Sequence, residues 1–415
     1  MQNIQINSQR LWNRLMRLSE ITVPDQPWTR RSFSPEFNRG RQWLTEEFKS
    51  VGLNVSTDTA GNLIGRLNGS AKKNLPIMIG SHSDTVPFGG RFDGILGVLS
   101  GLEAIQTLKE NGALPAHDIE LVDFLAEEPS EFGLSCIGSK AMAGKLESEQ
   151  LDLTDGNGRK LGDAIRSVGG DPELLHQASR GANSIVAYLE IHIEQATRLE
   201  SAGLSIGVVT DIAAIRRENI RVVGRADHAG ATPMGLRKDA LVTAAYLISA
   251  TEELTEAANA SVAAIVATIG KLSVSPNAAN AVPGEVEFTL EVRSGDDAKL
   301  KAHTDGLLKR YRDIAQSREQ AVHVQQVSCG TSTKSAAKVM RAIETASQNE
   351  GLQTMQLSSG AGHDAVYVSH LGPAGMIFVP CRDGRSHTPE EWVDEVGCAR
   401  GAQVLLGALL ELDKE

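Results

Sequence analysis

The chain has 415 residues, which is too long for one ordinary hydrophobic core and therefore predicts at least two domains. Hydrophobic residues make up 41 % and charged residues 22 %, values that are typical of a soluble globular enzyme. The formal net charge of −11 argues against a nucleic-acid partner, because phosphate binding requires clustered lysine and arginine.

The four cysteines show no CxxC pair and no regular spacing, which argues against a disulfide framework and favours a reducing cytosol. The first five residues lack the basic region and apolar stretch of a signal peptide. No run of 18 apolar residues is present, so we expect no membrane partner. The expected location is the cytoplasm.

The first two hundred residues alternate short apolar runs with helical patterns, which predicts an α/β domain with a mostly parallel sheet. Strands are predicted at residues 77–80 and 119–125, and helices at 95–108 and around 141–143. A third apolar stretch covers residues 185–193.

A second pattern begins near Gly207 and follows the order strand, helix, strand, strand, helix, strand. The elements are predicted at residues 220–223, 239–258, 262–270, 284–293, 299–316 and 322–327. This order is that of a ferredoxin-like α+β sandwich.

After about residue 330 the α/β pattern returns, with a helix at 336–349 and a strand at 376–379. The simplest architecture is one domain interrupted by a smaller insertion. We therefore predict a metal-binding catalytic domain formed by residues 1–209 and 330–415, and an inserted domain formed by residues 210–329.

Candidate metal ligands stand where the apolar runs end or, for one of them, inside a run. They are His82, Asp93, Glu128, His192 and His387. The carboxyl ends of neighbouring strands in open α/β sheets gather such side chains at one edge. Imidazole and carboxylate are the ligands of zinc, manganese and cobalt.

Two metal ions about 3.5–4 Å apart need a bridging carboxylate, and Asp93 is the natural candidate. His82 and His192 would complete one site, and Glu128 and His387 the other. Each residue alone has a simpler interpretation: Asp93 as a helix N-cap, His82 as a structural histidine, the Glu127–Glu128 pair as a solvated loop. A metal site accounts for all of them with one cause.

Two neighbours of these ligands have expected supporting roles. Asp84 stands two residues after His82 and could hold the imidazole nitrogen that does not face a metal. Glu127 and Glu128 on extended backbone would point to opposite sides. Glu128 could then bind a metal while Glu127 faces the bound water.

Several segments in a fixed order carry a family resemblance. They are GSHSDTV (80–86), GGRFDGILGVLSGLE (89–103), AEE (126–128), LEIHIEQ (189–195), GRADHAGATPM (224–234), NAANAVPGEVEFTLEVRS (277–294), SGAGHDA (359–365) and GRSHTPEE (384–391). With these, nearly the whole chain resembles the amidase, hydantoinase/carbamoylase family of the aminoacylase/carboxypeptidase clan of dinuclear metallohydrolases. That family includes N-carbamoyl-L-amino acid hydrolases, allantoate amidohydrolases and β-ureidopropionases.

The resemblance implies a phosphorylase/hydrolase-like catalytic domain interrupted by a ferredoxin-like domain that serves as lid and dimerisation domain. It also implies two divalent metal ions per subunit, zinc first, with manganese or cobalt as alternatives. His192 fits the carbamoylase branch, since peptidase relatives usually carry a carboxylate there. The expected assembly is a homodimer, and it stays open whether the partner subunit completes the active site.

By the same resemblance Glu127 is the general base and acid, with Asp84 and His228 as further catalytic residues. The implied substrate-binding residues are Gln195, Asn280, Arg293, Gly362 and His363. A guanidinium such as that of Arg293 suits a substrate carboxylate, although a surface salt bridge is the alternative. His228 could equally be a turn histidine, and Asn280 an Asx-turn residue.

The sequence departs from the family pattern beside the ligands rather than at them. Ala196 and Thr197 follow Gln195, Pro129 follows the glutamate pair, and Arg385 replaces a usual apolar residue. The metal chemistry therefore carries over, while the substrate stays open.

The expected reaction is hydrolysis of the linear amide C–N bond of an N-carbamoyl-L-amino acid or related ureido acid. It would release ammonia, carbon dioxide and the amino acid from a small carboxylated substrate. The alternatives are an allantoate amidohydrolase or β-ureidopropionase, an aminoacylase or dipeptidase of the same clan, and a non-catalytic binder that has kept the fold.

Overall fold

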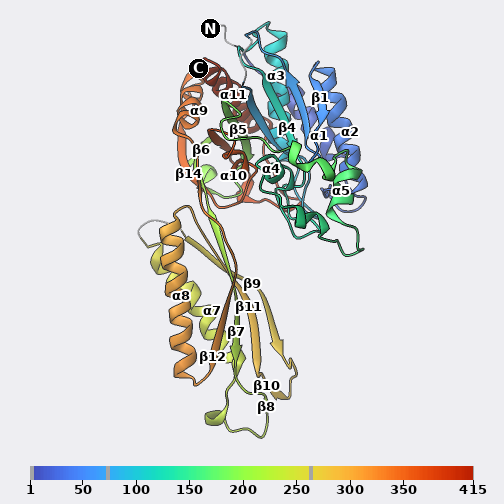
Figure 1. Ribbon diagram of the computed structural model, residues 1–415. Helices are drawn as coiled ribbons and strands as arrows, with labels where there is room; N and C mark the ends of the chain where they lie inside the picture. The colour runs from blue at the N-terminus through green and yellow to red at the C-terminus, as the bar shows by residue number, and fades with distance from the viewer. Residues whose placement is uncertain (1–3, 72–74, 261–264, 415) are drawn as a thin grey trace. The chain divides into compact units, whose positions relative to one another are not determined.

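The computed structural model describes residues 4–71, 75–260 and 265–414, and the chain divides into two compact units (Figure 1). The first unit comprises Met1–Thr210, Ser335–Leu357 and Gly362–Glu415. The second comprises Asp211–Lys334 and Ser358–Ala361.

The first unit is built on a sheet in the order β1-β2-β4-β3-β5-β15-β6-β13, with β14 beside β6. The strands are β1 (Asn54–Thr57), β2 (Leu63–Leu67), β3 (Ile77–His82), β4 (Ile119–Phe124), β5 (Ala187–Ile193), β6 (Ile206–Ile212), β13 (Thr333–Lys334), β14 (Thr354–Ser359) and β15 (Ala374–Val379). The central strands β4, β3, β5 and β15 are mutually parallel. Strands β1, β2, β6 and β13 pair antiparallel at the margins.

Helices surround this sheet. They are α1 (Ser8–Ser19), α2 (Pro35–Ser50), α3 (Ile95–Glu110), α4 (Ile137–Met142), α5 (Leu161–Ser167), α6 (Arg198–Ala202), α9 (Ala337–Asn349), α10 (Ala365–Val368) and α11 (Glu395–Leu412), with short 3₁₀ turns at Ser148–Asp152, Pro172–Gln177 and Arg382–Gly384. Side chains cap several of them: Ser34 accepts from the Phe37 N–H at the start of α2, and Asp394 from the Gly397 N–H at the start of α11.

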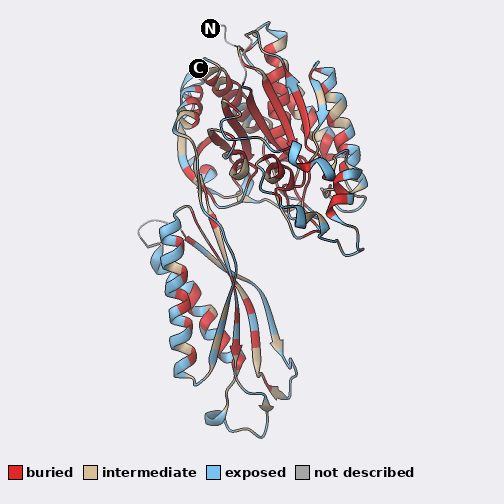
Figure 2. Cartoon of the chain, in the orientation of Figure 1, coloured by how far each residue is buried: buried red, intermediate tan, exposed pale blue. Residues whose placement is uncertain are grey.

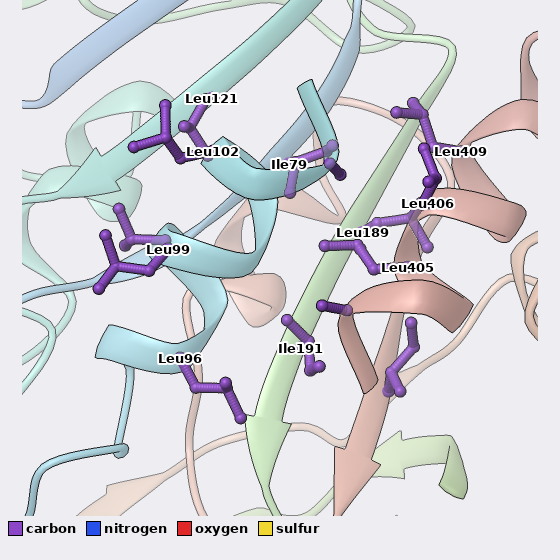
Figure 3. Packing of buried hydrophobic residues seen from close by; sticks show 14 of the residues in the cluster. Ile79, Leu96, Leu99, Leu102, Leu121, Leu189, Ile191, Leu405, Leu406 and Leu409 are labelled. Atoms are coloured by element: carbon purple, nitrogen blue, oxygen red, sulfur yellow. The ribbon is translucent and has the colours of Figure 1, made fainter. Parts of the chain in front are cut away.

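The central strands are buried at every position because helices cover both faces of the sheet. On one face α3 and α11 pack against β3, β4 and β5, and Figure 3 shows their leucines meeting the side chains of Ile79, Leu121, Leu189 and Ile191. Successive strand residues point to opposite faces, so Glu190 faces the other way, where its carboxylate accepts from the backbone N–H of Ala365 in α10.

The second unit has a four-stranded antiparallel sheet in the order β12-β7-β11-β9. Its elements are β7 (Ala214–Val223), α7 (Ala240–Ala258), β9 (Ile265–Ser275), β11 (Glu285–Ser294), α8 (Asp297–Ser317) and β12 (Ala321–Cys329), with a 3₁₀ turn at Met234–Leu236 and a separate pair of short strands, β8 (Asp227–His228) and β10 (Ala281–Val282). Helices α7 and α8 pack on the sheet through one buried stripe each (Figure 2).

The fold class predicted from the sequence is confirmed in both units, including the strand-helix-strand-strand-helix-strand order of the second. Strand β7 begins six residues earlier than predicted, because Arg217 and Asn219 face open solvent and broke the apolar signal. Residues 262–264 of a predicted strand lie outside the described residues. The two-residue strand β13 and the six-residue strand β14 were not predicted.

Candidate metal centre and active site

The chemistry of the first unit is concentrated at the carboxyl end of its parallel strands. His82 is the last residue of β3, His192 is the penultimate residue of β5, and Asp93 lies just before α3. Glu127 and Glu128 follow β4, and His387 follows β15 and a short turn. Parallel strands end on the same side of a sheet, so residues far apart in sequence meet here.

Among the described residues, two overlapping groups place their ligand atoms within 4.8 Å of one another. They are His82, Asp93 and His192, and Asp93, Glu128 and His387. Oδ1 of Asp93 lies 3.4 Å from Nε2 of His82 and 3.2 Å from Nε2 of His192. Oδ2 lies 3.5 Å from Nε2 of His387, which is itself 3.3 Å from Oε1 of Glu128. Asp93 thus turns one oxygen toward each group.

The hydrogen bonds of the buried histidines show that the groups fit a cation. Nδ1 of His82 lies 3.1 Å from the carbonyl oxygen of Asp84, and Nδ1 of His192 lies 2.9 Å from that of Ile193. A carbonyl oxygen only accepts, so Nδ1 of each ring carries the proton and the lone pair of a neutral ring is on Nε2. Both Nε2 atoms lie close to the Asp93 carboxylate. Nε2 of His192 also accepts from the Gly94 N–H at 3.2 Å, whereas buried Nε2 of His82 has no hydrogen-bond partner among the described residues. Acceptors facing each other at this range suit a divalent metal ion between them.

Gly94 explains how His82 can approach the start of α3. A Cβ atom at this position would lie 2.4 Å from the His82 ring, and the backbone has φ of +67°. Both the space and the backbone conformation therefore require glycine. Three further residues of the site, Ala126, Gln195 and His387, have φ between +52° and +57°, a region that non-glycine residues rarely occupy.

The Glu127–Glu128 pair is held by Asp84. Both carboxylate oxygens of Asp84 accept, at 3.3 Å each, from the backbone N–H groups of Glu127 and Glu128. The Asp84 carbonyl, rather than its carboxylate, makes the bond to His82, because the carboxylate stays 3.6 Å from Nδ1. The two glutamates lie on a loop after Ala126 and not on the extended strand that we expected.

Glu127 lies beside the first ligand group, with Oε2 3.6 Å from Nε2 of His82. The thiol of Cys136 donates to its Oε1 at 3.5 Å. Burial raises the pKa of Glu127 well above its usual value, against the opposing effect of His82 and with the support of Asp364 and Glu128. A carboxylate with a raised pKa is a stronger base, which suits a group that accepts a proton near neutral pH.

The candidate ligands shift each other's pKa values. Burial alone would raise the pKa of Asp93, but the three histidines around it hold that pKa well below its usual value. Hydrogen bonds to Asp93 and Glu128 raise the pKa of His387 to about 11. A carboxylate that stays ionised between three imidazoles is an arrangement typical of metal sites.

The structure places the other predicted residues of the first unit as follows. Nε2 of Gln195 donates to Oδ2 of Asp93 at 2.7 Å, so in this structure Gln195 contacts a ligand. The buried ring of His363 packs against that of His192, with the ring centroids 4.6 Å apart. Gly362, next to it, is exposed.

His228, Asn280 and Arg293 lie in the second unit. His228 ends β8 and Asn280 precedes β10, whose Ala281 pairs with His228. Nδ1 of the exposed His228 accepts from the Gly230 and Ala231 N–H groups at 3.1 Å. The proton of a neutral His228 ring is therefore on Nε2, which is a donor. Arg293 lies on the open face of β11, where it binds the carboxylate of Glu291 and the carbonyl of Gly360, each at 2.7 Å.

Sequence reasoning missed four buried groups around the site: Cys136, Glu190, Asp364 and Glu391. Glu190 and Asp364 lie behind the ligands, and Glu391 contacts the backbone of the Asp93 loop. Glu190, Asp364 and Glu391 had a signal, since they lie in the LEIHIEQ, SGAGHDA and GRSHTPEE segments, whereas Cys136 had none. Acidic residues near a loop are usually solvated, and burial cannot be read from their identity.

Comparison with known proteins identifies the family. Residues 78–411 match peptidase family M20/M25/M40. The chain belongs to this family. It is 39 % identical over 411 residues to an N-carbamoyl-L-amino acid amidohydrolase of Geobacillus stearothermophilus, which covers 98 % of this chain and 99 % of the relative. A ureidoglycolate hydrolase of Oryza sativa subsp. japonica is 34 % identical over 97 % of this chain and 84 % of its own length.

Solved structures place this M20 chain in the expected branch. A hydantoinase/carbamoylase family amidase from Burkholderia multivorans superimposes with a TM-score of 0.91 at 34 % identity, covering 99 % of both chains. The predicted family and the prediction of a hydrolase are thus confirmed. No helix in the described part of the chain is both long and apolar enough to cross a membrane.

Proposed function

We propose that this M20 hydrolase cleaves the linear amide C–N bond of an N-carbamoyl-L-amino acid or a related ureido acid. One observation carries the proposal: Asp93 is shared between two groups of ligand atoms, and Glu127 stands beside them. The relatives named N-carbamoyl-L-amino acid amidohydrolase, which match this chain over nearly its full length, support the choice of substrate class.

The two ligand groups would hold one divalent metal ion each, zinc first, with manganese or cobalt as alternatives. Asp93 would contribute to both, joined by His82 and His192 on one side and by Glu128 and His387 on the other. Bound there, the ions would make the attacking water more acidic and neutralise negative charge that develops during the reaction.

Glu127 is the proposed general base and acid. Its carboxylate accepts a proton from the attacking water and delivers it to the leaving nitrogen as the first C–N bond of the carbamoyl group breaks. The carbamic acid that remains loses carbon dioxide when its own C–N bond breaks, so the products are ammonia, carbon dioxide and the amino acid. The backbone N–H groups of Glu127 and Glu128 donate hydrogen bonds to Asp84, and these bonds hold the loop that carries the Glu127 carboxylate. Both steps use only the water and the substrate.

Residues of the second unit are the proposed substrate-binding groups, together with Gln195, Gly362 and His363. The Nε2–H of His228 would donate to the oxyanion, with Asn280 next to it. Arg293 would bind the substrate carboxylate with N–H groups that Glu291 and Gly360 leave available.

We also propose a homodimer that forms through the second unit. Strand β9 ends the sheet order, and large apolar side chains are exposed on it and on α7: Leu241, Val242, Tyr246, Leu254, Val266 and Leu272. An uncovered sheet edge with apolar neighbours favours a protein interface. Analytical ultracentrifugation should show a dimer for the intact chain and a monomer for Leu272→Glu.

The four unpaired cysteines favour the cytoplasm as the location of the protein.

A substrate panel tests the activity. Purified protein loaded with zinc, manganese or cobalt should release ammonia from N-carbamoyl-L-amino acids and leave N-acetyl-L-amino acids intact. Hydrolysis of the acetyl compounds alone would instead identify an aminoacylase. Allantoate and ureidoglycolate belong in the panel because relatives from rice and Arabidopsis thaliana carry the names ureidoglycolate hydrolase and allantoate deiminase.

A further inference from the structure

Glu391 is a buried acidic residue on the segment that follows His387. Its side chain is almost fully enclosed, and it lies 298 residues from Asp93 in the sequence. Oε1 accepts from the backbone N–H groups of Phe92 and Asp93, at 2.8 Å and 3.0 Å. One carboxyl oxygen therefore fixes the main chain from which the shared ligand projects.

The second oxygen of Glu391 reaches the side chain of the same ligand through Ser386. Oε2 lies 3.0 Å from Oγ of Ser386, and that hydroxyl lies 2.7 Å from Oδ2 of Asp93. Gln195 donates to the same Oδ2 at 2.7 Å. Glu391 therefore acts on Asp93 in two ways. Its Oε1 binds the main chain of Asp93, and its Oε2 reaches Oδ2 of Asp93 through the Ser386 hydroxyl.

The surroundings of Glu391 are built to admit this carboxyl group. A Cβ atom at Gly90 would lie 1.9 Å from its carboxyl atoms, so glycine alone leaves the space. The neighbouring Arg91 stacks on Trp28 at 3.9 Å, and Trp28 donates to the carbonyl oxygen of Pro389. These contacts join the loop before Asp93 to the segment that carries Glu391.

We propose that Glu391 is a positioning residue that orients Asp93 for metal binding, acting through the Phe92–Asp93 backbone and through Ser386. The proposal rests on the proposed function, in which Asp93 serves both metal sites. A carboxylate that must present one oxygen to each site tolerates little rotation. Loss of a hydrogen-bonding partner behind a metal ligand typically lowers metal affinity about 10–100-fold.

The contacts also specify which substitution preserves the function. The amide oxygen of Glu391→Gln can accept both backbone N–H groups, and its NH₂ group can donate to Oγ of Ser386, which then donates to Asp93. Glu391→Ala removes every one of these contacts. Glu390→Gln is the matched control, because the adjacent Glu390 is exposed and its carboxylate contacts Arg385 and Thr388 rather than the Asp93 loop.

The test titrates the full-length, metal-free protein with Mn²⁺ alone and follows the heat of binding. We expect Glu391→Ala to raise the Mn²⁺ dissociation constant about 10–100-fold, while Glu391→Gln and Glu390→Gln stay within about threefold of the wild type. Melting temperatures of the metal-free variants separate loss of metal affinity from loss of fold. A Glu391→Ala protein that is destabilised yet binds Mn²⁺ like the wild type would make Glu391 merely structural and overturn the proposal.

Ser386→Ala keeps the proposal testable if Glu391→Ala does not fold. It removes only the side-chain route, so the dissociation constant should rise less than in Glu391→Ala but beyond the Glu390→Gln control. An unchanged Mn²⁺ affinity in Ser386→Ala would contradict the proposed contact through Ser386. A loss of Mn²⁺ affinity in Glu391→Gln as large as in Glu391→Ala would contradict the proposed positioning role. Failure of the wild-type protein to bind Mn²⁺ would instead refute the proposed metal centre itself.

Discussion

The two units use the same polar residue types in opposite environments. Strands β3, β4, β5 and β15 are buried at every position, whereas β11 alternates between a buried face toward the helices and an open face. In a sheet that is covered on both sides, the polar side chains at the ends of the strands are buried away from water. A sheet that is covered on one side leaves them hydrated.

The environment decides what a charge can do. The side chains of His82 and Glu127 are 1 % and 10 % exposed, whereas those of Arg217 and Glu291 on the open face are 44 % and 22 % exposed. Buried charges interact strongly and shift each other's pKa values, while exposed ion pairs gain little. This contrast supports the proposed roles, which are metal binding and proton transfer in the first unit and substrate binding in the second.

The largest expected effect comes from the buried base. Glu127→Gln should lower kcat about 10²–10⁴-fold without loss of metal, because the amide accepts no proton in place of the carboxylate. Steady-state kinetics and metal analysis measure the two parts. Glu131→Gln, on the same loop but exposed, is the control and should keep its rate. Full activity in Glu127→Gln would rule out Glu127 as the general base.

Crowding of His82 should have the next largest effect. Gly94→Ala forces a Cβ atom against the imidazole, so we expect metal affinity to fall about 10–100-fold or more. Gly112→Ala has nearly the same φ, +64°, but no atom within 4 Å. It should lose only about 1 kcal/mol of stability and bind metal normally. Equal metal affinities in the two variants would mean that His82 does not depend on this contact.

The open face of the second unit should affect substrate binding. Arg293→Ala should raise KM for carboxylated substrates about 10–100-fold with a smaller change in kcat, since a charge-assisted bond is worth about 1.5–3 kcal/mol. Arg221→Ala removes another arginine of that face, which pairs with Glu285, and should leave KM unchanged. If both variants have the KM of the wild type, the carboxylate is bound elsewhere.

Exposed ion pairs should have the smallest effect. Lys301 and Asp305 form a pair one helical turn apart in α8, and both are exposed. Lys301→Ala should change the free energy of unfolding by less than about 0.5 kcal/mol in urea denaturation. Leu247→Ala, in the buried core of the same unit, should cost about 2–5 kcal/mol. A large effect of Lys301→Ala would contradict the contrast between the two environments.

Sequence predicted the elements with regular apolar patterns. Strands β3 and β4, helix α3 and the interrupted order of the two units follow from periodicity, and all five predicted ligands lie at one sheet edge as expected. These features depend on local pattern and on the rule that parallel strands share a carboxyl end.

The supporting contacts could not be predicted because they join distant segments. The partners of Glu391 depend on how residues 386–391 fold over the loop at 88–93. The Asp84 carboxylate binds loop N–H groups more than 40 residues away, which no spacing rule indicates. Strand β13 has two residues, too few for a periodic signal, and β14 buries a single hydrophobic side chain, that of Leu357.

Location of the metal ions tests the central claim most directly. Crystals of the full-length protein grown with Mn²⁺ should give two anomalous-scattering peaks per chain, one beside His82 and His192 and one beside Glu128 and His387, with Asp93 contacting both. A single peak elsewhere, or no peak at Asp93 when Mn²⁺ is saturating, would contradict the shared-carboxylate centre on which the proposed hydrolysis depends.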